Sequence, residues 1–234
     1  MDEAYRAKRA TIFGRRHGHK LTPRRAGLLQ SLLPPLALDL TLPAGDLRRL
    51  FGPRVEAVGL EIGFGGGEHL IAQAERAPRL GVIGVEPFVN GMAKALAAIA
   101  AKNLGNIRLY QGDAREVIAW LPSGSLVRVD LLYPDPWPKR RHWKRRLVQD
   151  WSLAEIARIL QGNGEFRFVT DVADYAAWTL ARGLRTRDLV WTAEKADDWR
   201  HPWEGFTPTR YEAKAKGSGR QPCYMIFRKE AAPP

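Results

Sequence analysis

The chain has 234 residues, of which 45% are hydrophobic, and it carries a formal net charge of +12. This length allows one sizeable domain or a domain with an arm, and no apolar run is long enough to cross a bilayer. The N-terminus lacks the apolar segment of a secretory signal, and Cys223 is the sole cysteine, so an internal disulfide is excluded. We therefore expect a protein of the reducing cytoplasm.

The positive charge is concentrated in two short stretches. Residues 1–30 hold eight basic and two acidic residues, and residues 139–146 hold six basic residues and no acidic one. A localised excess of this kind is typical of a surface that binds a polyanion such as a nucleic acid. Neither stretch has a sustained apolar face, so binding to a membrane surface is not expected.

Residues 1–40 are predicted to form a basic arm and the start of a connector. Gly14 and Pro23 interrupt any long helix in the arm, and four prolines between residues 31 and 53 mark the connector. We place a single domain over residues 41–230 and a short tail over residues 231–234.

Short apolar strands alternate with amphipathic helices from residue 55 onward. The apolar runs predict strands over residues 55–63, 80–87, 106–113, 127–135 and 165–171. Helical spacing predicts helices over residues 67–77, 90–103, 114–121, 147–164 and 172–183, with Asn90 as the N-cap of the second. Successive units of this kind indicate an α/β fold with a doubly wound, mostly parallel sheet. Two last strands over residues 188–194 and 223–229 have no predicted helix between them, so we expect an antiparallel edge hairpin in a seven-stranded sheet.

The first predicted strand runs into a glycine-rich turn, "LEIGFGGGEH". Gly63, Gly65 and Gly67 of this turn follow a G-x-G-x-G spacing, whereas a dinucleotide fingerprint requires its third glycine at the position that Glu68 occupies. Glu61 and Glu68 would also repel a pyrophosphate. A ligand without phosphate and with positive charge, such as S-adenosylmethionine, suits this turn better.

Acidic residues stand at the ends of three successive predicted strands. Glu61 could neutralise the cationic groups of S-adenosylmethionine, Glu86 could bind its ribose hydroxyls, and Asp113 could accept from its adenine amino group. Because the carboxyl ends of parallel strands meet at one crevice, the three side chains are expected to converge there. Together with the glycine turn they favour a methyltransferase over an α/β protein of another kind.

The stretch "DLLYPDPWPKRRHWKRR" covers residues 130–146 and joins a strand to a block of positive charge. Pro134, Pro136 and Pro138 restrict the backbone around Asp135, since each ring fixes φ. Basic runs are most often solvated surface. This run follows directly on a buried strand and a rigid proline segment, which favours the mouth of an active site.

The segments "LEIGFGGGEH", "GVEP", "QGDA", "PDPWPKRRHWKRR", "FVTD" and "TRYE" together resemble the bacterial tRNA (guanine-N7-)-methyltransferases. The resemblance covers most of the chain and implies a Rossmann-like class I fold that methylates a guanine in the tRNA variable loop with S-adenosylmethionine. It implies cofactor contacts from Glu61, Gly63, Gly65, Gly67, Glu86, Asp113, Ala114 and Asp135, with Asp135 also the catalytic residue. It implies substrate contacts from Lys139, Asp171, Thr209, Arg210, Tyr211 and Glu212. Arg140, Arg141, Lys144, Arg145 and Arg146 are then expected to bind tRNA phosphates.

The chemistry of the acceptor atom limits what Asp135 has to do. Guanine N7 carries a lone pair and no proton, so its methylation requires no general base. Asp135 is therefore expected to orient the base and to stabilise the positive charge that develops on it. Asp171 and Glu212 could accept hydrogen bonds from guanine, and Trp137 or Tyr211 could stack on it.

Two other functions stay open. One is an exocyclic-amino methyltransferase, because "PDPWP" loosely resembles the D-P-P-aromatic motif of that class. The other is a non-catalytic RNA-binding protein on a methyltransferase fold, although decay of that kind should remove the cofactor carboxylates, which are present. The five histidines lack metal-site spacing, so no metal is expected, and the sequence is compatible with a monomer or a homodimer.

Overall fold

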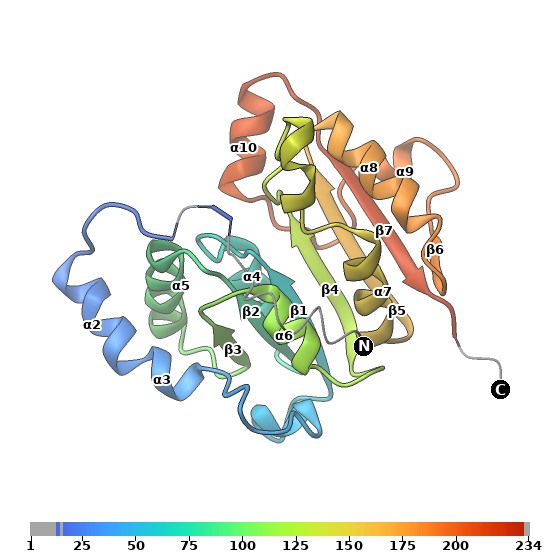
Figure 1. Ribbon diagram of the computed structural model, residues 1–234. Coiled ribbons are helices and arrows are strands. Elements are labelled where there is room, and N and C mark those ends of the chain that lie inside the picture. The colour runs from blue at the N-terminus through green and yellow to red at the C-terminus, as the bar shows by residue number, and fades with distance from the viewer. Residues whose placement is uncertain (1–12, 15, 232–234) are drawn as a thin grey trace.

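The computed structural model of the chain describes residues 13–14 and 16–231 (Figure 1). In this described part, one sheet of seven strands has the order β3-β2-β1-β4-β5-β7-β6. The strands are β1 (Ala57–Ile62), β2 (Leu80–Val85), β3 (Ile107–Tyr110), β4 (Leu126–Leu132), β5 (Leu160–Thr170), β6 (Leu189–Trp191) and β7 (Cys223–Lys229). Strands β1 to β5 are parallel, and β7 is antiparallel to both β5 and β6. The predicted doubly wound sheet with an antiparallel edge is confirmed.

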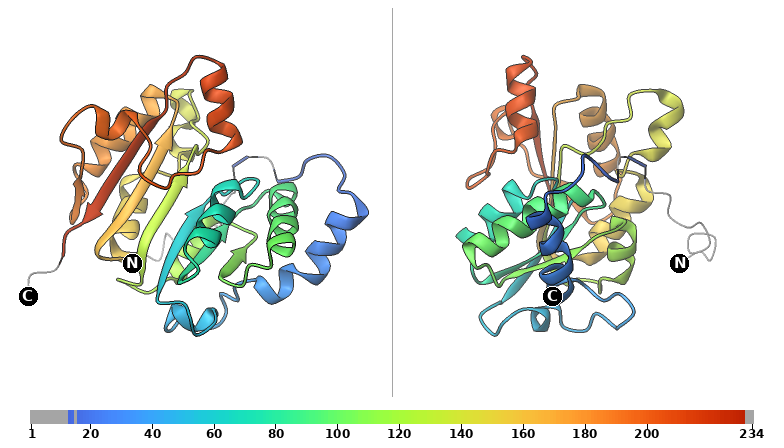
Figure 2. Two further views of the ribbon diagram at one scale, coloured as in Figure 1. Left: turned by 180° about the vertical axis from the view of Figure 1, so that it is seen from behind. Right: turned by 90° about the vertical axis from the view of Figure 1, so that its left-hand side faces the viewer.

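Helices lie on both sides of the sheet, as Figure 2 shows. They are α2 (Pro23–Ser31), α3 (Leu33–Leu36), α4 (Glu68–Arg76), α5 (Val89–Lys102), α6 (Ala114–Trp120), α7 (Asp150–Ile159), α8 (Ala173–Gly183), α9 (Asp197–Arg200) and α10 (Arg210–Gly217), with 3-10 helices η1 (Leu47–Leu50) and η2 (Arg140–Arg145). Parallel strands covered by helices on both faces are apolar over most of their length. Every residue of β1 and β2 after the first is buried, Glu61 of β1 included.

The predicted arm and connector contain helices that the sequence pattern did not indicate. Thr22 caps α2 by accepting from the backbone N–H of Arg25, and Pro23 occupies the first helical position, where its missing N–H costs nothing. Leu28 and Leu32 then pack against the apolar cluster that includes α5. Asn90 is not an N-cap, because α5 begins one residue earlier. The arm residues 1–12 and 15, and residues 232–234 of the predicted tail, lie outside the described residues.

Two further boundaries differ from the prediction. The segment 160–164, predicted as the end of a helix, is the start of β5, because α7 ends at Ile159 and Asn163 adopts a left-handed backbone with φ of 64°. The strands β6 and β7 are separated in the chain by two short helices, α9 and α10, so they do not form the simple edge hairpin that was predicted. Strand β7 lies between β5 and the edge strand β6. No helix within the described part of the chain combines the length and apolarity of a membrane span.

Candidate active site

The strand order reverses between β1 and β4, whose neighbours lie on opposite sides. In open α/β sheets, ligands bind outside the carboxyl ends of the strands at such a reversal. The glycine turn follows β1, Glu86 follows β2, Asp113 follows β3 and Asp135 lies beyond β4. The topology thus brings these four sequence-predicted positions to one edge of the sheet.

The glycine turn has a backbone that side chains would strain. Gly63, Gly65 and Gly67 have φ of 72°, 57° and 83°, in the left-handed region that glycine adopts readily. Gly67 is also the N-cap of α4, and a Cβ at this position would lie 2.9 Å from the Cβ of Ala95. The turn therefore places helix α4 close against α5 and leaves its own backbone open to a ligand.

Glu86 holds the glycine turn to the end of β2. Its Oε2 accepts from the backbone N–H of Gly65 at 2.7 Å, and its Oε1 accepts from that of Phe88 at 2.9 Å. Burial raises the pKa of Glu86, the two backbone N–H groups lower it, and the charge of Asp135 raises it further, with a net increase. The charge of Asp135 acts on Glu86, so the carboxylates that follow β2 and β4 lie near each other.

Glu61 is the first member of a buried line of polar side chains, here called the Glu61 relay: Glu61, His69, Gln73, Arg128 and Asp130. Glu61 Oε2 lies 2.9 Å from His69 Nδ1, and His69 Nε2 lies 2.8 Å from Gln73 Nε2. Arg128 donates to Gln73 Oε1 at 2.9 Å and to Asp130 Oδ2 at 2.7 Å. Arginine can only donate, so Gln73 directs its N–H at Nε2 of a neutral His69, whose Nδ1–H donates to Glu61.

Two nearby carboxylates oppose the effect of burial on the pKa of His69. Burial and the charge of Arg128 lower the pKa of the imidazole, but the charge and hydrogen bond of Glu61, with the charge of Asp130, outweigh them and raise that pKa above its ordinary value. Glu61 was predicted from the sequence, whereas the other four members were not. The register could have suggested Asp130, because it pairs with Glu61 on the adjacent parallel strand.

Asp113 is buried and already has two partners. Its Oδ1 accepts from the backbone N–H of Arg115 at 2.9 Å, which caps α6, and the Arg115 guanidinium lies 2.5 Å from Oδ2. Ala114 is the first residue of that helix. An adenine amino group would therefore meet a carboxylate that Arg115 already orients.

Asp135 lies in a strained segment. Tyr133 and Trp137 have left-handed φ values of 50° and 42°, although each precedes a proline. Such backbone costs on the order of 1–3 kcal/mol per residue and persists only where the surroundings hold it. The Asp135 side chain reaches solvent, yet burial by the neighbouring protein raises its pKa. Gly14 of the arm lies beside it, since a Cβ there would be 3.3 Å from Asp135 Oδ2.

The arm continues along the same edge of the sheet. The carbonyl of Arg16 accepts from the backbone N–H of Val89 at 3.0 Å, at the start of α5. The side chain of Asn90 accepts from the N–H of Gly18 and donates to the carbonyl of His19, both at 2.7 Å. Asn90 thus joins the arm to the domain instead of capping its own helix.

The run Thr209–Glu212 forms the start of α10 and lies next to the glycine turn. Thr209 caps the helix, and the ring of Tyr211 approaches Gly65, where a Cβ would be 3.7 Å from the ring. Tyr211 is 49% exposed. Glu212 is buried and accepts from Tyr224 at 2.8 Å, whereas its Oε2 has no hydrogen-bond partner among the described residues.

Asp171 follows β5 and is also near this edge. Its Oδ2 accepts from Arg220 at 2.6 Å, a partner that the sequence analysis did not identify. Arg210 approaches the carboxylates of the site closely enough to lower the pKa of Glu86. Lys139 is exposed at the start of η2.

The basic run divides into exposed and buried members. Arg140, Arg141 and Lys144 are exposed, and Arg145 is partly covered, with its guanidinium 5.0 Å from the ring of Trp137. Arg146 is 2% exposed. Aromatic rings enclose its guanidinium, which argues against the phosphate-binding role predicted for Arg146.

The acidic side chains at this edge of the sheet suit S-adenosylmethionine. The site gathers carboxylates from Glu61, Glu86 and Asp135 around an open glycine backbone, which favours a cationic ligand without phosphate. Among the described residues, no group of three or more His, Cys, Asp or Glu side chains could hold a metal ion. Strand order, glycine turn and strand-end carboxylates together define a class I S-adenosylmethionine-dependent methyltransferase.

Comparisons with known proteins agree with this class and narrow it. A family model described as "Putative methyltransferase" matches residues 56–225. A tRNA (guanine-N(7)-)-methyltransferase of Rhodopseudomonas palustris is 59% identical over 95% of this chain and 87% of its own length. A protein of the same name from Bradyrhizobium diazoefficiens is 57% identical over 93% of both. The chain belongs to the tRNA (guanine-N(7)-)-methyltransferase family.

Solved structures with low sequence identity share the fold. The aminoglycoside resistance methyltransferase NpmB1 has a TM-score of 0.51 and 17% identity, and the match covers 76% of this chain and 89% of that one. A 30S ribosomal methyltransferase from an uncultured bacterium has a TM-score of 0.51 and 15% identity, over 82% of this chain and 94% of that one. The predicted class I fold and family are therefore confirmed, and the roles of individual residues stay predictions.

Proposed function

We propose that this chain transfers the methyl group of S-adenosylmethionine to N7 of a guanine in the variable loop of tRNA, in the cytoplasm. Family membership supports the reaction. The observation that carries it in this chain is the meeting of Asp135, Glu86 and the glycine turn with the Thr209–Glu212 run at one edge of the sheet. A cofactor and a base would each find candidate contacts there.

The residues would assist the reaction by charge and position. S-adenosylmethionine supplies a methyl group on a positively charged sulphur, and guanine N7 has no proton to remove. We assign to Asp135 a negative charge close to the base on which positive charge develops. Pro134 and Pro136 restrict the backbone on both sides, so the carboxylate is held in place before the substrate arrives.

The carboxylates of Asp171, beyond β5, and Glu212, in α10, would recognise guanine. The unpartnered Oε2 of Glu212 is a buried acceptor, and such an atom gains most from a ligand that donates to it. Asp171 Oδ1 could accept from a second guanine N–H, while Arg220 holds Oδ2. Tyr211 is exposed beside the glycine turn and could stack on the base. Adenine lacks this pair of donors and would leave both acceptors unsatisfied.

The tRNA backbone would be bound by the exposed part of the basic run. Lys139, Arg140, Arg141 and Lys144 reach solvent next to the Asp135 segment. Contacts between these cations and phosphates supply affinity that falls with salt and carry no sequence information. Their place beside Asp135 would bring the nucleotide to the site.

Incubation of the chain with unmodified tRNA and methyl-labelled S-adenosylmethionine is expected to label a guanine, located by cleavage at N7-methylguanine. Asp135→Asn keeps the shape of the side chain but removes its charge. It should lower kcat by about 10²–10³-fold, as loss of one preorganised electrostatic group does, without weakening tRNA binding.

Asp188→Asn is a matched control, because Asp188 is an exposed acid at the start of β6 with no part in the site. That variant should retain the full rate. Label on an exocyclic amino group would falsify the N7 assignment. Tight cofactor binding without transfer to any tRNA would instead favour a binding protein.

A further inference from the structure

Arg146 ends the basic run yet lies inside the protein. It is 2% exposed, whereas Arg140 and Arg141 of the same run are exposed. A buried guanidinium requires partners for its charge, because an arginine cannot lose its proton in a protein. Arg146 has polar partners at Nε and Nη2, whereas its buried Nη1 has no hydrogen-bond partner among the described residues. The partners of Arg146 therefore indicate what the residue does.

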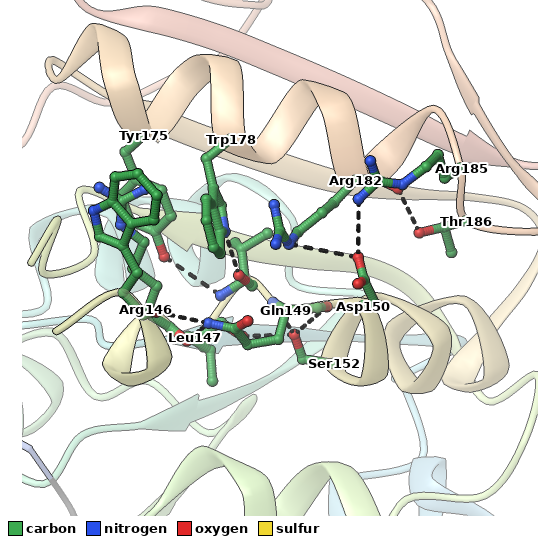
Figure 3. Close-up of polar contacts among 12 residues, drawn as sticks. Arg146, Leu147, Gln149, Asp150, Ser152, Tyr175, Trp178, Arg182, Arg185 and Thr186 are labelled. Carbon is green, nitrogen blue, oxygen red and sulfur yellow. Dashed lines mark hydrogen bonds and ion pairs between the residues drawn. The ribbon is translucent and has the colours of Figure 1, made fainter. Parts of the chain in front are cut away.

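Aromatic rings from two elements enclose the guanidinium. Its central carbon lies 4.8 Å from the ring centroid of Tyr175, 4.9 Å from that of Trp178 and 5.1 Å from that of Trp143. Tyr175 and Trp178 extend from α8 toward Arg146, as Figure 3 shows, and Trp143 belongs to η2. Arginine stacks well on such faces, so the rings fix the plane of the group.

Arg146 also has two polar partners, one in the Asp135 segment and one in helix α8. Arg146 Nε donates to the carbonyl of Pro136 at 2.8 Å, and a terminal nitrogen forms an ion pair with Asp174. Pro136 follows Asp135 directly, and Asp174 lies in the first turn of α8, three residues after Asp171. The guanidinium of Arg146 thus connects the backbone next to Asp135 with helix α8, which begins just after Asp171.

The contact to Pro136 falls in the strained segment. Tyr133 and Trp137, on either side of it, have left-handed backbones that few residues before proline adopt. Such conformations persist only where the surroundings determine them. The buried guanidinium of Arg146, whose plane is fixed by the rings, is well suited to hold the carbonyl of Pro136 between these two residues.

We propose that Arg146 is a positioning residue that fixes the Asp135 segment relative to the start of α8, and thereby sets the separation of Asp135 and Asp171. This role replaces the phosphate contact expected from the sequence. The inference rests on the proposed methyl transfer, because its effect appears in the rate of that reaction. Arg146 acts through the two carboxylates and touches neither substrate.

The first test replaces two structural arginines in the same way. Arg146→Lys keeps the charge but loses the planar fork that serves Pro136 and Asp174 together. The control is Arg158→Lys, because Arg158 of α7 also binds backbone carbonyls, those of Ile118 and Leu121, away from the site. Single-turnover methyl transfer is measured per S-adenosylmethionine-binding site, counted by calorimetry, so that unfolded protein does not contribute.

The expected result is a rate per binding site that falls about tenfold to hundredfold in Arg146→Lys, since small displacements of reacting groups have effects of that size. The rate per site should not change in Arg158→Lys. If Arg146→Lys had fewer S-adenosylmethionine-binding sites but an unchanged rate of methyl transfer at each site, the residue would have a packing role alone. That result would overturn the proposal.

A second measurement separates positioning from phosphate binding. The slope of log K for tRNA against log salt should become shallower by about 0.7–0.9 in Arg141→Met, the loss of one phosphate contact. The slope should not change in Arg146→Met. A loss of one contact in Arg146→Met would show that the buried guanidinium reaches RNA in the complex, against the proposal.

Asp174→Asn provides a variant that should fold normally, because the Asp174 side chain is 55% exposed. It removes the charged partner of Arg146 and leaves the aromatic enclosure intact. We expect a severalfold slower single turnover with normal cofactor binding, and a wild-type rate would contradict the link to α8. Failure of the unaltered chain to methylate any tRNA would refute the proposed function. A normal rate in the unaltered chain together with unchanged rates in the variants would refute the role of Arg146 alone.

Discussion

Asp135 has two properties that determine how its charge responds to pH. It lies between prolines in a strained segment, and burial raises its pKa. Its proposed role requires the ionised carboxylate. Because the pKa is raised, that form is present above the shifted pKa and is lost as the pH falls through it, at a higher pH than for an ordinary aspartate.

We therefore predict that kcat, measured with both substrates saturating, decreases on the acid side at a pH above the usual range of an aspartate. This limb should disappear in Asp135→Asn, whose rate stays low throughout. Glu86 also has a raised pKa, but its protonation should affect cofactor affinity instead, so kcat and the cofactor Kd separate the two groups. An acid limb of kcat that is unchanged in Asp135→Asn would assign it to another residue.

At the scale of elements, the Glu61 relay joins β1, α4 and β4 behind the glycine turn. Arg128 of β4 determines the orientation of Gln73, Gln73 that of His69, and His69 donates to Glu61. The relay would hold the Glu61 carboxylate in one orientation toward the cofactor. Side chains from three elements thus fix a single acceptor.

His69→Leu should weaken S-adenosylmethionine binding by about tenfold to hundredfold, because a hydrogen bond to a buried charge contributes about 1.5–3 kcal/mol. His69→Asn, which can place an N–H near the position of Nδ1, should recover most of this affinity. Calorimetric titration of the cofactor gives both values. Equal affinities for the unaltered chain and the leucine variant would remove His69 from the cofactor site.

Elements with strong patterns were predictable from the sequence, and contacts between distant segments were not. Alternating apolar runs gave the strands and their parallel order, and the glycine turn was recognised because left-handed backbone selects glycine at Gly63, Gly65 and Gly67. Helix α10 was missed, since its eight residues include one buried apolar side chain, Ala215. The burial of Arg146 depends on Tyr175 and Trp178, more than 25 residues away, as well as on the nearby Trp143, and no local pattern reveals the two distant rings.

For the whole molecule, the site depends on the assembled sheet. The proposed cofactor contacts do not come from a single segment, because their carboxylates stand at the ends of β1 and β2 and beyond β4. A ligand that contacts all three would bind the folded chain and not the unfolded one. Binding should therefore increase the stability of the complete domain.

At a concentration one hundred times its Kd, S-adenosylmethionine should stabilise the fold by about 2.7 kcal/mol. For a chain of this size that corresponds to an increase in Tm of about 5–10 °C, measurable by scanning calorimetry. Glu86→Gln keeps an oxygen acceptor near Gly65 and loses the charge, and it should show a smaller increase at the same concentration. An equal increase in that variant would show that the Glu86 charge does not contribute to binding.

The place of β7 between β5 and β6 affects how the protein is made. Strand β6 pairs with β7 alone, and β7 comes later in the chain than every other strand of the described sheet. While the ribosome is still translating the last part of the message, β5 has an open edge and β6 has no neighbour. The Thr209–Glu212 run is anchored by Tyr224 of β7 through Glu212. A nascent or prematurely terminated chain could thus form the cofactor half of the sheet but not a complete substrate site, so methylation would begin only after synthesis has passed β7.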